Sequence, residues 1–229
     1  MAKIDWIVGT STIIYFATAI TEIVSSVPVG LTQDDFGNNC ILSASMTYFY
    51  HNTTMVVKQF GSPGACGFCT YLTTVTVLYA LGYGCYSAYA LYKSVENAQH
   101  MWVLPAIMAC SLLCILKFIS SCVLSVGFSQ FCKAVVDGTY IKNCQGGQDA
   151  DWFYGTTALT SSNYYAYMTT AQSASWFCVF EWFLLAGLGF LHYRRNIALR
   201  SYGRFDQGFG SSDTQGIVSG DALPGNVQA

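Results

Sequence analysis

Charged residues are scarce in this chain of 229 residues. Asp, Glu, Lys and Arg make up only 10% of the sequence, against roughly 25% in an ordinary soluble domain. Basic residues are too few for a nucleic-acid partner, because the net charge is −2 and neither half of the chain carries a basic stripe. The low charge content therefore excludes an ordinary water-soluble protein and predicts an integral membrane protein.

Residues suited to metal binding or catalysis are also sparse. The three histidines, His51, His100 and His192, lie too far apart in the sequence to suggest a metal site. The sequence has no motif for a Ser or Cys nucleophile, no phosphate-binding loop and no pair of catalytic carboxylates. We therefore expect no cofactor, no small-molecule substrate and no enzyme activity, apart from one alternative described below.

Long apolar runs are what the sequence does contain. A bilayer core of about 30 Å needs roughly 20 helical residues. Four runs reach this length and predict an all-α, four-helix membrane bundle, with spans at residues 6–27, 66–91, 103–128 and 171–192. The first run is longer than the apolar region of a cleaved signal peptide, so we expect the first helix to remain.

The positions of the lysines and arginines predict the orientation in the membrane. Lys3 precedes the first span, Lys93 lies between the second and third, and four arginines follow the fourth. By the positive-inside rule, both termini are cytoplasmic, in a plasma or secretory-pathway membrane. The cytoplasmic segments are then residues 1–5, 92–102 and 193–229, and the outer loops are residues 28–65 and 129–170. The Gly-, Ser- and Asp-rich tail at 193–229 is predicted to be disordered.

Three ionisable residues fall inside the predicted spans. Lys117 is central in the third span, where an unpaired ammonium would cost several kcal/mol. Counting residues from the inner boundary places Glu22 at a similar depth, and Glu181 lies within reach if the lysine bends downward. We favour a structural intramembrane ion pair with one of these carboxylates over an ion or proton pathway, because three isolated groups are too few to line one. Contact of these groups with lipid or with a partner is the remaining alternative.

The first outer loop is predicted to form a small hairpin. Pro28 and Gly30 are expected to end the first helix. Residues rich in Ile, Thr, Tyr, Phe and Val then flank a turn at His51 and Asn52. Asn52 begins an Asn-Thr-Thr glycosylation sequon at that turn. In the second outer loop, the aromatic residues 152–154 are placed to pack on this hairpin or to meet a partner.

Small residues recur at four-residue spacing in two of the spans. This pattern allows the backbones of two membrane helices to approach closely. We predict that the two stripes face each other, although small residues are also common in membrane helices generally. The stripes are Ala80, Gly84 and Ala88 in the second span and Ala106, Cys110 and Cys114 in the third.

Ten cysteines divide between the spans and the outer side of the membrane. The four outer cysteines are expected to oxidise, and they allow three connectivities. The local pairs, Cys40 with Cys66 and Cys132 with Cys144, close the shortest loops and are favoured. Cys66 and Cys69 also form a CxxC motif, which leaves open a quinone-linked thiol oxidoreductase as the least favoured function.

Several segments in order resemble the transmembrane protein 179 family. They are VPVGLTQDDFGNNCIL, QFGSPGACGF, SVGFSQFC, Asn143-Cys144, AQSASWFCVFEWF and LHYRR. The family is grouped with claudin-like tetraspan proteins, so the resemblance implies a left-handed four-helix bundle with a small extracellular sheet from the first loop. Cys69 is not part of the family pattern. The chain also lacks the Gly-Leu-Trp signature of true claudins, which argues against a paracellular barrier.

Together these features favour a non-enzymatic tetraspan accessory protein. Such a protein would pack laterally on an ion channel, receptor or other membrane partner and alter its gating, assembly or trafficking. The alternative is a structural tetraspan that assembles with itself at junctions or in vesicle membranes.

Overall fold

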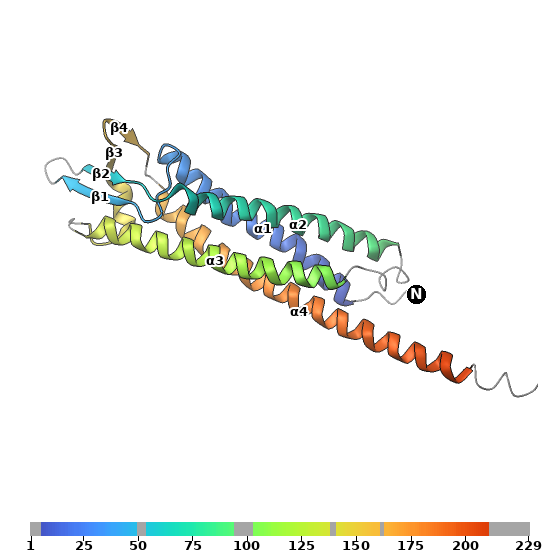
Figure 1. The fold of residues 1–229 in the computed structure, drawn as a ribbon. Coiled ribbons are helices and arrows are strands. Elements are labelled where there is room, and N and C mark those ends of the chain that lie inside the picture. The colour runs from blue at the N-terminus through green and yellow to red at the C-terminus, as the bar shows by residue number, and fades with distance from the viewer. Residues whose placement is uncertain (1–5, 50–53, 94–102, 138–140, 161–162, 211–229) are drawn as a thin grey trace, which may run out of the picture.

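Four long helices lie side by side along the molecule (Figure 1). The computed structural model describes residues 6–49, 54–93, 103–137, 141–160 and 163–210. Within these residues, helices of 30 to 47 residues measure about 45 to 70 Å, more than the roughly 30 Å of a bilayer core. Each has a stretch apolar enough to cross a membrane, so the predicted tetraspan fold is confirmed. The helices are α1 (Trp6–Asp35), α2 (Pro63–Tyr92), α3 (Val103–Val136) and α4 (Tyr164–Gly210).

Helix α1 continues through Pro28 to Asp35, so the expectation that Pro28 ends it was wrong. A proline removes one backbone hydrogen bond from a helix, but the turn that follows is anchored in the core. Thr32 is buried, and its Oγ1 donates a hydrogen bond of 2.8 Å to the Pro28 carbonyl oxygen. The helix ends before Gly37, whose φ of 64° is a left-handed conformation that glycine adopts without strain.

Helix α4 is longer than predicted and continues to Gly210. Figure 1 shows it projecting beyond the other three helices at the end of the molecule where the N-terminus lies. The expectation of disorder was therefore wrong for residues 193–210. No proline interrupts this segment, so the helix extends from the part of α4 that is packed in the bundle. The rest of the predicted tail, residues 211–229, lies outside the described residues.

A four-stranded sheet lies at the other end of the bundle (Figure 1). Strands β1 (Ser45–Phe49) and β2 (Thr54–Gln59) form the antiparallel hairpin predicted for the first loop. The second loop adds β3 (Asp151–Tyr154), parallel to β2, and β4 (Thr157–Leu159), antiparallel to β3. The expectation of a sheet from the first loop was thus incomplete. The predicted glycosylation site, Asn52, lies outside the described residues.

Trp152 in β3 packs against the helix bundle and so holds both outer loops in place. Its side chain is 1% exposed, stacks on Phe131 of α3 with ring centroids 5.9 Å apart, and meets Phe36 edge-on. Its Nε1 donates a hydrogen bond of 2.8 Å to the Gly147 carbonyl oxygen. In the sheet it aligns with Met55 of the hairpin, one of the two placements expected for this aromatic group. Such ring pairs stabilise a core beyond the burial of their area, so the second loop is held by packing as well as by strand pairing.

The two small-residue stripes do not face each other, which corrects the prediction from their spacing. A Cβ on Gly84 would lie 3.3 Å from the Cβ of Tyr15 in α1. Cys110 lies against the same tyrosine, and Cys114 Sγ is 3.8 Å from the Val179 carbonyl oxygen in α4. Large rings occupy the bundle centre, so the small residues accommodate side chains of α1 and α4. Ala80 and Ala106 are also buried, and Ala88 is half-buried.

Candidate functional site

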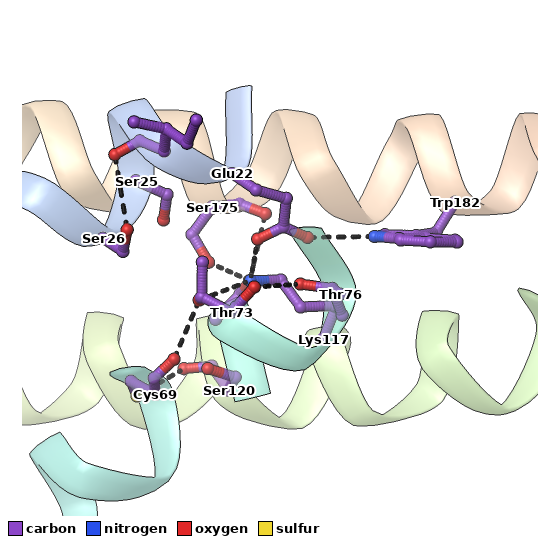
Figure 2. A network of polar contacts seen from close by, with 12 residues as sticks. Glu22, Ser25, Ser26, Cys69, Thr73, Thr76, Lys117, Ser120, Ser175 and Trp182 are labelled. Atoms are coloured by element: carbon purple, nitrogen blue, oxygen red, sulfur yellow. Dashed lines mark hydrogen bonds and ion pairs between the residues drawn. The ribbon is translucent and has the colours of Figure 1, made fainter. Parts of the chain in front are cut away.

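The centre of the bundle contains a buried ion pair between α1 and α3. Lys117 Nζ lies 2.6 Å from Glu22 Oε2, and the two side chains are 1% and 0% exposed. Lys117 is about 21 Å along α3 from Val103, near the middle of the helix. Of the two carboxylates that the sequence offered, Glu22 is the one that binds the lysine. Figure 2 shows the two side chains pointing toward each other across the bundle.

Two further side chains complete the hydrogen bonding of this pair. Thr73 Oγ1 of α2 accepts a hydrogen bond of 3.2 Å from Lys117 Nζ, and Trp182 Nε1 of α4 donates one of 3.0 Å to Glu22 Oε1. All four helices therefore contribute to one network (Figure 2). A buried ion pair is stable only when such additional bonds offset its loss of hydration.

Sequence analysis did not identify Thr73 or Trp182. One signal was available in the sequence, since Trp182 lies inside a predicted span and follows Glu181 directly. A buried indole normally needs an acceptor for its N–H, and Glu22 is an acceptor at that depth. Thr73 carried no comparable signal, because α2 contains several threonines at similar spacing.

A small cavity adjoins the ion pair on its sheet-facing side. Its free space is about that of one water molecule. Its polar lining comes from Lys117, two threonines and four serines, namely Thr70, Thr73, Ser25, Ser26, Ser120 and Ser175. Lys117 has a third N–H beyond those bonded to Glu22 and Thr73, so the cavity suits a bound water better than an organic ligand. Among the described residues, no three His, Cys, Asp or Glu side chains gather as a metal site.

Glu181 lies apart from this network, at the seam between α4 and α1. Its Oε1 is 3.2 Å from Thr21 Oγ1 of α1. Thr18 is also near this carboxylate, but Oε2 is buried without a hydrogen bond of normal geometry. Within the described part of the chain, no ion pair joins Glu181 to a cation. Of the two glutamates, Glu22 is therefore paired with a cation and Glu181 is not.

Aromatic rings close the bundle on the other side of the ion pair. Tyr15 packs against Tyr83 and Trp182, with ring centroids 5.1 and 6.5 Å apart. Beyond these rings, a second cavity of about 30 Å³ is lined by Ser11, Ser87 and His192 among other residues. Among the described residues, the ring cluster lies between the two cavities, which share no lining residue.

The outer cysteines form the two local disulfides that the sequence favoured, Cys40–Cys66 and Cys132–Cys144. Cys66 is therefore not paired with Cys69, as a CxxC oxidoreductase would require. Cys69 is a buried free thiol whose Sγ lies 3.8 Å from the Ser120 carbonyl oxygen. The Cys66–Cys69 dithiol that a thiol oxidoreductase would need is therefore not formed.

Comparison with known families gives the same architecture. The model of the transmembrane protein 179/179B claudin domain matches residues 7–217. The chain belongs to the transmembrane protein 179/179B claudin-domain family. The resemblance seen in the sequence is confirmed, and this family member is a claudin-like multi-pass membrane protein. The match spans all four helices and both disulfides. No solved structure matches the chain.

Proposed function

We propose that this claudin-like chain is a non-enzymatic accessory protein. It packs laterally on an ion channel, receptor or other larger membrane protein and modulates the gating, assembly or trafficking of that partner. The observation that carries the proposal is the network at the bundle centre, where Lys117, Glu22, Thr73 and Trp182 bind one another. Side chains committed to each other in this way hold the helices together and leave few polar groups to transport a solute.

The outer surface of α4 supports lateral packing. Phe177, Phe180 and Phe183 are 66%, 59% and 66% exposed and point away from the bundle. Membrane proteins associate through close side-chain packing, since lipid tails are as apolar as the side chains they replace. A row of large, rigid rings offers a neighbouring membrane helix an extensive contact surface.

The orientation proposed from the sequence has additional support from the disulfides. Both disulfides lie at the sheet end of the bundle, and disulfides persist in oxidising compartments. Arg194 and Arg195 lie toward the opposite end, as the positive-inside rule requires for a cytoplasmic face. On this proposal Asn52 is extracellular or lumenal and glycosylated. Loss of an endoglycosidase-sensitive mass shift in Asn52→Gln would establish its use.

The accessory role is tested by cross-linking the tagged chain in cells and purifying it in mild detergent for mass spectrometry. We expect a larger membrane protein at a stoichiometric level. Replacing Phe177 and Phe180 with alanine should lower its recovery. The matched control replaces Leu112 and Ile115, which are exposed to a similar extent on α3. Recovery of the chain alone would contradict the accessory role, and recovery as a homo-oligomer would favour the self-assembling alternative.

A further inference from the structure

Glu181 occupies the boundary between the buried and exposed faces of α4. Cys178, Trp182 and Leu185 are buried on one side of it, and Phe177 and Leu184 are exposed on the other. Glu181 itself is half-buried. At 100° per residue, this arrangement places the glutamate at the edge of the helix that meets α1. Glu181 therefore lies on the seam between α1 and α4, partly exposed at the edge of the bundle and with its Oε2 covered.

The depth of Glu181 is fixed by its neighbours. The next residue, Trp182, binds Glu22, and Thr21, which precedes Glu22, lies against Glu181. Glu181 is thus level with the Glu22–Lys117 pair, near the middle of the bundle. An intramembrane carboxylate at this depth is costly unless a partner neutralises it.

The charges at this level do not balance. The two glutamates are accompanied by a single ammonium group, and Lys117 is bound to Glu22 at 2.6 Å in a sealed interior. Glu181 is therefore left without a cation at this level. No other lysine or arginine lies near the middle of a described helix, because Lys93 and Lys133 are at helix ends and the α4 arginines follow residue 193.

The hydrogen bonds that reach Glu181 are also too few. Thr21 has one hydroxyl proton, and its Oγ1 lies 3.0 Å from the Ala17 carbonyl oxygen and 3.2 Å from Glu181 Oε1. The proton can serve only one of these acceptors fully. Glu22, by contrast, receives separate donors from Lys117 and Trp182. Thr18 of α1 is also near this carboxylate, but no hydrogen bond of normal geometry reaches Glu181 Oε2. The seam therefore lacks a positive charge, and Oε2 lacks a well-placed donor.

We propose that the α1–α4 seam at Glu181 is a docking site for a transmembrane helix of another protein that carries a lysine or arginine near mid-membrane. This inference rests on the lateral-docking function proposed above and specifies its surface and the chemistry of its partner. The cation would supply the missing charge and donors, while Phe177 and Leu184 would pack beside it. A second copy of this chain does not fit, since the only mid-membrane cation in its described helices is Lys117, which is already bound.

The test uses designed transmembrane helices in phosphatidylcholine vesicles containing the purified full chain. One dansyl-labelled leucine–alanine helix carries a single central lysine, and a second carries leucine at that position. Quenching of the native tryptophan fluorescence reports binding. We expect the lysine helix to bind about tenfold more tightly than the leucine helix, as intramembrane polar contacts of this kind allow.

Two variants locate the effect. Glu181→Gln keeps the shape of the side chain and should remove the preference for lysine. Leu112→Ala, at an exposed position on α3 away from the seam, should keep it. Formation of both disulfides checks that each variant is folded. Equal binding of the two helices to the wild-type chain, or a lysine preference that persists in Glu181→Gln, would overturn the proposal. So would self-association of the wild-type chain that Glu181→Gln abolishes.

The outcomes also separate this inference from the accessory role. If a cellular partner co-purifies equally with wild type and Glu181→Gln, and the vesicles show no lysine preference, the accessory role stands and the docking site is wrong. If the chain purifies alone from cells but selects the lysine helix in vesicles, the docking site at Glu181 is supported and the accessory role is wrong.

Discussion

Lys117 Nζ and Glu22 Oε2 lie 2.6 Å apart between α3 and α1, and neither side chain is more than 1% exposed. Two groups held this closely in a dry interior depend on each other. Removing one leaves the other as an uncompensated buried charge, which costs far more than losing a surface ion pair. The pair is therefore the point at which substitutions have the most predictable consequences.

We expect Lys117→Met to destabilise the protein by about 3–5 kcal/mol, because the Glu22 carboxylate would lose its cation while remaining buried. Unfolding of the purified protein in detergent, followed by circular dichroism, measures the loss. The double variant Glu22→Gln with Lys117→Met removes both charges and should recover most of the stability. If the single variant keeps wild-type stability and surface expression, the ion pair has no structural role.

The two intramembrane glutamates should respond oppositely to the same substitution. Glu22→Leu strands Lys117 and should lower the unfolding temperature, since a buried ammonium loses its only anion. Glu181→Leu removes a carboxylate with no cation among the described residues, so the unfolding temperature should stay unchanged or rise. Both variants are measured in the same detergent and without a partner. A similar loss of stability in both would show that Glu181 is neutralised within the chain.

The disulfides make a prediction that peptide mapping can check. Digestion without reduction should yield Cys40 linked to Cys66 and Cys132 linked to Cys144, with Cys69 free. Loop-closure entropy predicts that breaking the first pair, which spans 26 residues, costs about 3.5 kcal/mol and the second, spanning 12, about 3 kcal/mol. Cys40→Ser tests the first value against Cys85→Ser, a change at an exposed free thiol. A Cys66–Cys69 linkage would restore the oxidoreductase alternative.

The four spans and the local disulfides could be predicted because each follows from short-range information. Apolar length alone identifies a membrane helix, and a disulfide that closes a short loop needs no knowledge of the tertiary fold. The first-loop hairpin follows from residue type on either side of a turn in the same way. The need of Lys117 for a carboxylate was also visible, because an isolated mid-membrane charge is rarely tolerated.

The features that sequence analysis missed depend on contacts between distant segments. Pro28 remains helical because Thr32 and the core beneath it hold the next turn. Strand β3 pairs with β2 because Trp152 is buried among the rings of Phe36, just after α1, and Phe131 of α3, which no local pattern shows. Lys117 binds Glu22 and not Glu181 because the rotation of each helix places Glu22 inside the bundle and Glu181 at its edge. Depth could be counted from the sequence, whereas rotation could not.

A glycine in α3 tests how the sheet is joined to the bundle. The carbonyl oxygen of Gly127 accepts a hydrogen bond of 3.0 Å from the Ser43 backbone N–H. A Cβ at this position would lie 2.8 Å from the Cβ of Leu42, which is 2% exposed and cannot move aside as a flexible side-chain end would. Gly127→Ala should therefore push the segment after Cys40 away from α3 and cost about 1–3 kcal/mol.

The matched control for this substitution is Gly187→Ala in α4, where an added Cβ meets no atom within 4 Å. Alanine favours a helix over glycine, so this variant should keep or slightly raise stability. Thermal unfolding in detergent compares the two, and limited proteolysis of the first loop shows whether the damage in Gly127→Ala is local. Equal unfolding temperatures would mean that Leu42 does not pack tightly on α3. The sheet would then be joined to this helix through the Cys132–Cys144 loop and Trp152 more than through the segment after Cys40.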